Sequence, residues 1–87
     1  MNCIINVGYG NMVNADRVIG IIKPEAAPVK RMIQNSKDTG KAFDATCGRK
    51  TKSVLVLDNG SIMLSALLPE TIASRINNDY GRGDIIE

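Results

Sequence analysis

The chain lacks several of the residue types that support common protein chemistries. Its 87 residues include no histidine and no tryptophan, and only one phenylalanine, two tyrosines and two cysteines. Without histidine, catalytic triads that use an imidazole base are excluded. Two cysteines that are not spaced as Cys-x-x-Cys do not predict a zinc site. Two isolated tyrosines also make too small a platform for stacking the bases of a single strand.

Long apolar runs are missing as well. No segment approaches the ~20 apolar residues of a membrane-spanning helix, and the first residues lack the basic and apolar regions of a signal peptide. We therefore expect a cytoplasmic protein with reduced thiols and no membrane partner. Asp44 and Cys47 are the residues most similar to a catalytic pair, but a carboxylate this close to a thiol in the sequence is more often a coincidence than a catalytic site. We expect no enzyme, no cofactor, no metal and no small-molecule substrate.

The apolar residues that are present exceed what a core of this size holds. Hydrophobic residues make up 44% of the chain, and almost all of them are aliphatic. A domain this short buries only about 60–65% of the surface that its unfolded chain exposes. Contact between subunits buries the remainder, so the composition favours a homo-oligomer.

The charges are unevenly distributed along the chain. Residues 23–52 carry eight cations and three acids, whereas residues 53–87 carry two cations and five acids. Residues 1–22 carry one charge of each sign, Arg17 and Asp16. A basic middle and an acidic end favour an extended polyanion as the partner.

The densest basic cluster is Arg49-Lys50-Thr51-Lys52, which lies between Gly48 and the apolar run 54–57. Like charges repel one another, so this cluster must lie on the surface, where a strand directly after it would hold it in place. Cations flanked by hydroxyl groups suit phosphate, which they neutralise and orient. The alternative for a lone charge run is a solvated loop without a ligand.

Apolar periodicity and turn residues predict a small α+β domain. The expected strands are 3–7, 12–22 with an interruption at 14–16, 42–46, 53–57 and 61–66, and the expected helices run from Pro28 to before Gly40 and from Pro69 to about Asn77. The order is strand, strand, helix, three strands, helix, in a mostly antiparallel sheet of about five strands. We expect residues 1–78 to form the single domain and residues 79–87 to form a frayed tail.

Two features near the start of the chain have ordinary explanations. Residues 8–11 (Gly-Tyr-Gly-Asn) resemble the start of a glycine-rich phosphate loop, but a strand follows them, so a hairpin turn is the better interpretation. Arg17 follows Asp16 at the head of an apolar segment, where a salt bridge at the rim is the simplest explanation. Asn11 and Asn14 lie nearby and would donate to phosphate or orient Arg17.

Four segments carry a resemblance to a known family. They are residues 6–13 (Asn-Val-Gly-Tyr-Gly-Asn-Met-Val), 15–17 (Ala-Asp-Arg), 24–31 (Pro-Glu-Ala-Ala-Pro-Val-Lys-Arg) and 44–51 (Asp-Ala-Thr-Cys-Gly-Arg-Lys-Thr), and residues 64–66, 69–73 and Arg75 continue the match. In their order and spacing over residues 4–76, these segments resemble the RemA family of small bacterial regulators of extracellular-matrix genes.

The resemblance implies a cytoplasmic DNA-binding transcription regulator that assembles into a homo-oligomeric ring and holds duplex DNA along a basic outer edge. It implies control of biofilm matrix genes, with DNA contacts from Arg17, Arg49 and Lys50 and with Pro28 in the region that shapes the subunit interface. Neighbouring positions complete both sets: Lys52, Thr51 and Asn11 for DNA, and Val29 and Met32 for the interface.

The chain departs from the family pattern at two positions. The family usually has a tyrosine where this chain has Cys47, and two consecutive arginines where it has Arg49-Lys50. Lysine keeps the charge but loses the bidentate fork of arginine, which weakens base reading more than backbone binding. A structural or interaction ring whose basic loop binds an acidic protein is the alternative function, and RNA binding is a further one.

Overall fold

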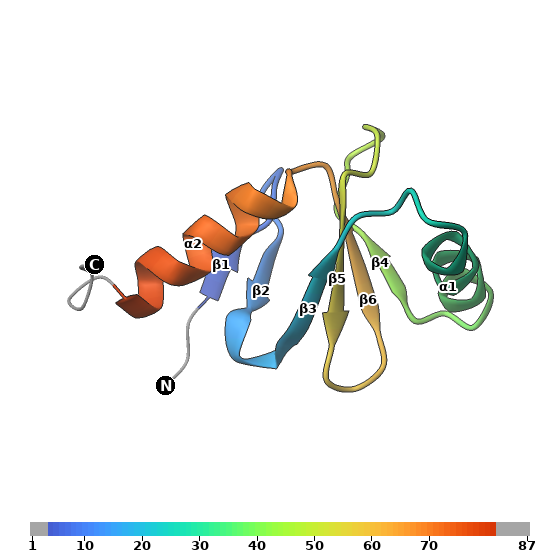
Figure 1. Ribbon diagram of the computed structural model, residues 1–87, viewed down its shortest axis with the longest axis horizontal. Helices are drawn as coiled ribbons and strands as arrows, with labels where there is room; N and C mark the ends of the chain where they lie inside the picture. Colours follow the sequence, from blue (N-terminus) through green and yellow to red (C-terminus); the bar gives the residue numbers. More distant parts are fainter. Residues whose placement is uncertain (1–3, 82–87) are drawn as a thin grey trace.

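Residues 4–81 are described in the computed structural model, which has two helices, one short 3₁₀ helix and two β-sheets. In chain order the elements are β1 (Ile4–Asn6), β2 (Met12–Asn14), η1 (Ala15–Arg17), β3 (Val18–Ile22), α1 (Ala27–Asp38), β4 (Ala42–Asp44), β5 (Ser53–Leu57), β6 (Ile62–Ser65) and α2 (Pro69–Gly81). Figure 1 shows α1 at one end of the molecule and α2 beside the β1–β2 hairpin at the other.

Tight turns join the hairpin strands where positive φ angles are tolerated. In the β1–β2 turn, Tyr9 and Gly10 have φ angles of 54° and 81°, and the Asn11 N–H donates to the Gly8 carbonyl at 3.0 Å. In the β5–β6 turn, Gly60 has a φ of 87°. Two successive positive φ angles match the twist of antiparallel strands. Both hairpins are those that the sequence predicts.

Each helix has, in its first turn, the proline that the sequence marks as a start signal. Pro28 stands in the first turn of α1, where its missing N–H leaves no hydrogen bond unmade. Gly40, with a φ of 75°, follows the end of α1 and stops it. Pro69 opens α2, and Glu70 lies at the positive end of that helix.

The larger sheet has the strand order β3-β5-β6-β4. The β3–β5 and β5–β6 pairs are antiparallel, whereas β4 runs parallel to β6. Because β6 is inserted between β4 and β5, the segment 45–52 that joins those two strands has to pass over the end of β6. This topology places the basic segment at one end of the sheet, where Figure 1 shows it as the uppermost loop.

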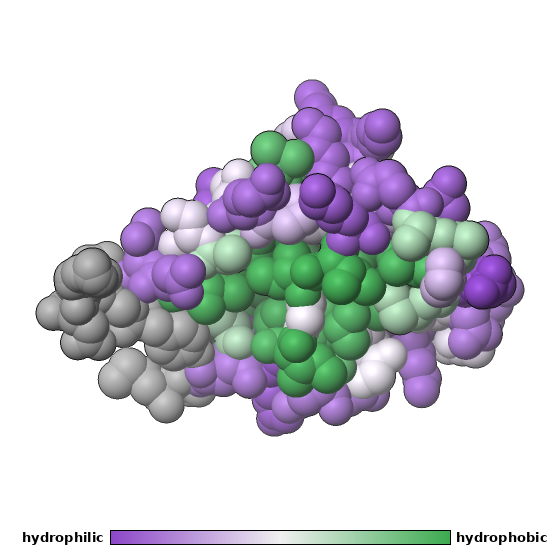
Figure 2. Space-filling view, viewed as in Figure 1, coloured by the Kyte–Doolittle hydropathy of each residue, from purple (hydrophilic) through white to green (hydrophobic). Residues whose placement is uncertain are grey.

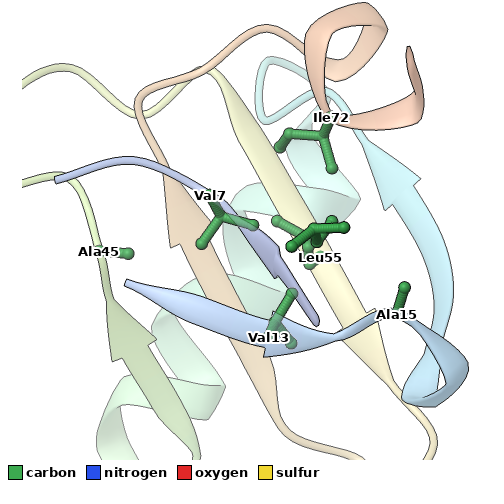
Figure 3. Packing of buried hydrophobic residues seen from close by; sticks show 7 residues of the cluster. Val7, Val13, Ala15, Ala45, Leu55 and Ile72 are labelled. Carbon is green, nitrogen blue, oxygen red and sulfur yellow. The ribbon is translucent and has the colours of Figure 1, made fainter. Parts of the chain in front are cut away.

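The sheet has a buried cluster on each face because successive side chains of a strand point to opposite faces. On one face, Leu55 packs with Val7 and Val13 of the hairpin and with Ile72 of α2, as Figure 3 shows. On the other face, the buried residues Val54, Ile62 and Leu64 are covered by half-buried side chains of α1, which are Val29, Met32 and Ile33.

The expectation of about five strands in one sheet is wrong, whereas the expected mostly antiparallel pairing is confirmed by three of the four strand pairs. The segment 12–22 forms two strands, β2 and β3, because the Asn14 side chain accepts the Asp16 N–H at 3.0 Å and caps the 3₁₀ turn between them. The hairpin therefore packs across the larger sheet as a separate two-stranded sheet, giving six strands in two sheets instead of about five in one. The β4–β6 pairing is parallel because the basic segment returns the chain beyond β6.

The second helix continues to Gly81, beyond the expected end near Asn77. Residues 79–81 of the expected tail therefore belong to α2, and residues 82–87 lie outside the described residues. The other predicted strand and helix positions agree with the structure to within about two residues, which is the ordinary uncertainty of element ends.

Large apolar side chains remain exposed at both edges of the larger sheet. Ile19 is 70% exposed on β3, at a bulge in its pairing with β5, and Phe43 is 60% exposed on β4. Figure 2 shows apolar residues gathered over the middle of the molecule, across β3 and β5. Within the part of the chain that the structure describes, no helix is long and apolar enough to span a membrane.

Candidate nucleic-acid interface

The basic segment begins with a tight turn that hydrogen bonds between Thr46 and Asp44 hold in place. Cys47 and Gly48 both have positive φ angles, of 54° and 81°, and the Arg49 N–H donates to the Thr46 carbonyl at 3.0 Å. Thr46 is 2% exposed, and its N–H and hydroxyl both donate to Asp44 Oδ1, at 2.8 and 2.5 Å. These bonds lower the pKa of Asp44, the side-chain bond more than the backbone bond.

Two buried serines hold the other end of the same segment. Ser53, the first residue of β5, donates its hydroxyl to the Leu67 carbonyl at 2.5 Å, and the Ser65 carbonyl at the end of β6 accepts the Lys52 N–H at 2.8 Å. Both side chains are fully buried. The basic segment is therefore anchored at both ends to the sheet, and its cations project from a fixed base.

Arg49 stacks on an aromatic side chain from the opposite turn. Its guanidinium carbon lies 4.9 Å from the centre of the Tyr9 ring, within the range of a cation–π contact. Tyr9 itself is held by the β1–β2 turn, where its φ angle is positive. The two turns thus meet above the same end of the sheet, and the stack limits the directions in which Arg49 can point.

Asn11, a predicted DNA contact, lies in that β1–β2 turn, and its side-chain amide forms hydrogen bonds within the turn. The amide nitrogen Nδ2 donates to the Gly8 carbonyl at 3.0 Å and to the Tyr9 carbonyl at 3.5 Å. Asn11 thereby stabilises the backbone of the turn that carries Tyr9.

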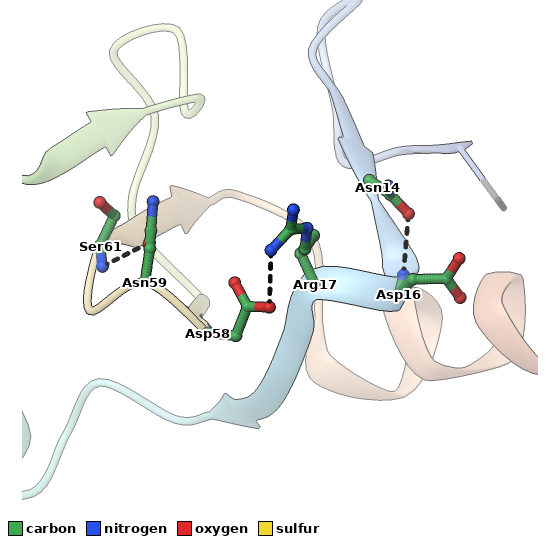
Figure 4. Close-up of polar contacts among 6 residues, drawn as sticks. All are labelled: Asn14, Asp16, Arg17, Asp58, Asn59 and Ser61. Carbon is green, nitrogen blue, oxygen red and sulfur yellow. Dashed lines mark hydrogen bonds and ion pairs between the residues drawn. The ribbon is translucent and has the colours of Figure 1, made fainter.

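Arg17 forms an ion pair far from the basic segment. Its Nη1 atom lies 3.0 Å from Oδ2 of Asp58, and the two side chains are 65% and 38% exposed. Figure 4 shows that this partner comes from the β5–β6 turn and that the neighbouring Asp16 points away. The expected salt bridge at the rim exists, but with Asp58. Asn14 caps η1 and does not contact the guanidinium.

The predicted DNA contacts therefore fall into two groups at opposite ends of β5. Lys52 directly precedes this strand, and Asp58, the partner of Arg17, directly follows it. At about 3.3 Å per residue, the two groups are roughly 20 Å apart. In Figure 1 the basic segment is at the top of the sheet and η1 is at the bottom. One subunit brings Arg49, Lys50, Thr51 and Lys52 together, but not Arg17.

The expected interface residues lie at the start of α1. Pro28 is exposed, whereas Val29 and Met32 are half-buried and pack against the cluster beneath the helix. Of these three residues, Pro28 is therefore the most accessible to a neighbouring subunit.

Sequence reasoning missed the role of Tyr9 as the ring beneath Arg49, and the role of Asp58 as the partner of Arg17. The two turns resemble each other locally, since Cys47-Gly48 and Tyr9-Gly10 both have positive φ angles. This resemblance does not predict that the two turns lie next to each other in the fold. Among the side chains of residues 4–78, no three cysteine or acidic groups converge as a metal site.

Comparison with known proteins places the chain among bacterial relatives. The family model described as "RemA-like: Extracellular matrix regulatory protein A-like" matches residues 4–76. The chain is 65% identical to a protein of Lachnoclostridium phytofermentans over 77 residues, which cover 88% of this chain and 85% of that protein. That relative is named only as a candidate regulatory protein.

Two more distant relatives carry names of the same kind. A protein of Synechococcus elongatus is 50% identical over 82 residues, covering 94% of this chain and 92% of its own length. A protein of Geobacillus kaustophilus is 48% identical over 83 residues, covering 95% and 92%. The match extends over nearly the whole described domain in each case. The chain is therefore a member of the RemA-like family of regulatory proteins.

Proposed function

We propose that the protein is a DNA-binding transcription regulator that acts in the cytoplasm as a homo-oligomeric ring and controls extracellular-matrix genes. The observation that carries this proposal is the basic segment, whose cations are anchored by buried hydrogen bonds at both ends and whose Arg49 stacks on Tyr9. Cations that are already ordered lose little conformational entropy when they bind phosphate.

The contacts suit the phosphate backbone more than the base edges. Arg49, Lys50 and Lys52 are exposed and lie in a loop, whereas direct reading of bases requires an element that enters a groove. Lys50 offers a point charge and no bidentate fork. Specificity would then come from the shape and bending of the duplex over several subunits.

The two edges of the larger sheet support assembly into a ring. The β3 edge and the β4 edge differ in length and sequence, and each exposes one large apolar residue, Ile19 or Phe43. Contact between one edge and the other edge of the next copy is heterologous, and such a contact forms a ring when the rotation between successive copies closes. Repetition would turn two weak groups of cations per subunit into a belt that binds with high avidity.

A mobility-shift assay over a salt series tests the proposal. The Arg49→Ala/Lys50→Ala double variant should bind duplex DNA more weakly, and its salt dependence should be shallower, because each phosphate contact contributes about −0.9 to the slope of log K against log salt. The matched control, Arg31→Ala/Lys41→Ala, removes the same two charges from α1 and the chain after it, and it should retain binding.

An unchanged affinity and salt slope in Arg49→Ala/Lys50→Ala would contradict the proposal. Binding that an excess of non-specific duplex DNA does not displace would favour the alternative, a ring whose basic loop binds an acidic protein. Tighter binding to single-stranded RNA than to duplex DNA would favour the RNA function.

A further inference from the structure

Two lysines outside the proposed DNA contacts converge with the basic segment. Lys23, in the connection between β3 and α1, lines an open hollow of about 350 Å³ together with Lys50, Thr51 and Lys52. Lys30 of α1 lines a second hollow of about 350 Å³ that also contains Lys50 and Thr51. The hollows share these residues and therefore adjoin one another. Four lysines from three segments thus line the two adjoining hollows.

The remaining lining has a different chemistry. Two carboxylates take part, Glu25 in both hollows and Glu70 at the start of α2 in the first. Apolar surface comes from Leu68 and Pro69 in the first hollow and from Pro24 and Ile33 in the second. The site therefore combines phosphate-binding cations, acceptors for hydroxyl or amino donors, and flat apolar contacts, all within the size range of small-molecule sites.

We propose that these adjoining hollows form a binding site for a nucleotide. The four lysines and the Thr51 hydroxyl hold its phosphates, Glu25 and Glu70 accept hydrogen bonds from ribose hydroxyls or from the amino group of the base, and the prolines and aliphatic side chains pack on the base. DNA phosphates can use Lys50, Thr51 and Lys52 at the rim, but the outside of the DNA backbone offers no donor to the two carboxylates, whereas a nucleotide supplies ribose hydroxyls and a base amino group.

Occupation of this site has a consequence for DNA that rests on the proposed function. Lys50, Thr51 and Lys52 belong both to the hollows and to the proposed DNA contacts. A nucleotide held there competes with the duplex for the same cations, so it lowers the affinity of the protein for DNA. Nucleotide binding itself does not depend on whether DNA is the partner.

Titration calorimetry with adenosine triphosphate tests the site directly on the full chain. The wild type should show saturable binding, and Lys23→Ala or Lys30→Ala should weaken that binding about tenfold, as expected for the loss of one charge-assisted contact to phosphate. Lys41→Ala removes an equivalent exposed charge outside both hollows and should change the affinity less than about twofold. No saturable binding, or an equal loss in Lys41→Ala, would overturn the site.

Two further arms separate a nucleotide site from a simple anion site. Inorganic pyrophosphate should bind more weakly than the nucleotide; equal affinity would overturn the assignment of the apolar lining to a base. Glu25→Gln and Glu70→Gln remove negative charge, so they strengthen binding if the carboxylates only repel phosphate. Weaker binding in either variant is the result expected here, because an amide is a poorer acceptor than a carboxylate.

The DNA measurement is kept separate from these arms. Lys23→Ala and Lys30→Ala leave the proposed DNA contacts intact, so DNA binding without nucleotide should be unchanged in both. Competition by nucleotide that persists in these variants would contradict the shared site. Loss of DNA binding in Arg49→Ala/Lys50→Ala tests the proposed function, and calorimetry with Lys23→Ala tests the nucleotide site, so the two can fail independently.

Discussion

A single carboxylate decides how much of the charge on Arg17 is available to a ligand. Asp58 Oδ2 lies 3.0 Å from Nη1 of Arg17, and both side chains are largely solvated. A pair of this kind adds only about 0.2–1 kcal/mol to the free energy of unfolding. Its main effect is therefore on the charge and orientation of Arg17. Asp58 restrains the guanidinium and partly neutralises it.

Replacing Asp58 by asparagine should therefore strengthen binding to duplex DNA. Asp58→Asn removes the competing negative charge and leaves Arg17 in place, so we expect an affinity up to about fivefold higher at low salt and a difference that shrinks as salt rises. Fluorescence anisotropy with a labelled duplex measures both. The control is Asp38→Asn, which removes an exposed acid that accepts from Gln34 on α1. A lower affinity in Asp58→Asn would show instead that Asp58 orients Arg17 for contact.

The carboxylate of Asp44 links the turn of the basic segment to pH. Hydrogen bonds from Thr46 hold its pKa below the ordinary value of 3.8, so the folded state favours the ionised form. The resulting stability is present above the ordinary pKa and is lost as the pH falls through the lower folded value.

We expect Asp44→Asn to flatten the acid limb of stability. Between about pH 5 and pH 2, the free energy of unfolding should fall more in the wild type than in this variant, because asparagine has no proton to gain there. Urea unfolding followed by circular dichroism at several pH values measures this difference. Asp16→Asn serves as the control, since its carboxylate accepts no hydrogen bond from Thr46. Parallel pH profiles for wild type and Asp44→Asn would contradict the expectation.

At the scale of elements, the two similar turns act together. The turn at Tyr9-Gly10 supplies the ring, and the turn at Cys47-Gly48 presents the guanidinium that lies 4.9 Å from it. Neither turn alone fixes the direction of Arg49. The contact stabilises an exposed loop by about 0.5–1 kcal/mol, and it orders the side chain that we propose to contact DNA.

Substitutions of Tyr9 should separate the ring from its hydroxyl group. Tyr9→Ala removes the surface on which Arg49 stacks and should weaken DNA binding about two- to fivefold, the equivalent of 0.5–1 kcal/mol. Tyr9→Phe keeps the ring and should bind nearly as well as the wild type. Anisotropy titrations compare the three proteins, and thermal unfolding checks that all are folded. Equal losses in both variants would mean that the hydroxyl group, and not the stack, serves binding.

Prediction from the sequence succeeded for the elements with strong local signals. Pro28 and Gly40 delimit α1, and residues 58–60 form the β5–β6 turn, because proline fixes its own φ angle and glycine tolerates the positive φ that a helix end or tight turn requires. The interruption at residues 14–16 could be predicted, but the Asn14 cap also separates β2 and β3 into different sheets, which the apolar pattern of the segment does not show. The parallel β4–β6 pairing depended on contacts between segments distant in the chain, which no local pattern encodes.

The candidate site divides in the same way. The basic segment is contiguous, so its charge is visible in the sequence and its anchoring at Ser53 could be expected from the strand that follows. Arg17 lies close to Asn11 in the sequence, but η1 and β2 carry it to the other end of the sheet (Figure 1). Proximity along the chain therefore misled the grouping of these residues.

At the scale of the whole molecule, the proposed assembly places the subunit contact at the two exposed edges of the larger sheet. Edge strands offer unpaired backbone groups to other chains unless they are protected. The bulge at Ile19 blunts the β3 edge, while Phe43 extends from the short β4 edge. Apolar side chains so exposed on edges are costly in a monomer and stabilising in an assembly.

Charged substitutions at these edges should dissociate the oligomer without unfolding the subunit. In Ile19→Glu and in Phe43→Glu a carboxylate replaces a side chain that is 70% or 60% exposed, so the subunit core is untouched. Light scattering in high salt should give a smaller mass for both variants than for the wild type, and DNA affinity should fall with it because avidity is lost. Met12→Glu places the same charge on an equally exposed residue of β2 and should leave the mass unchanged. A wild-type chain that is monomeric in high salt would contradict the assembly itself. Unchanged masses for both edge variants would place the subunit contact on another surface.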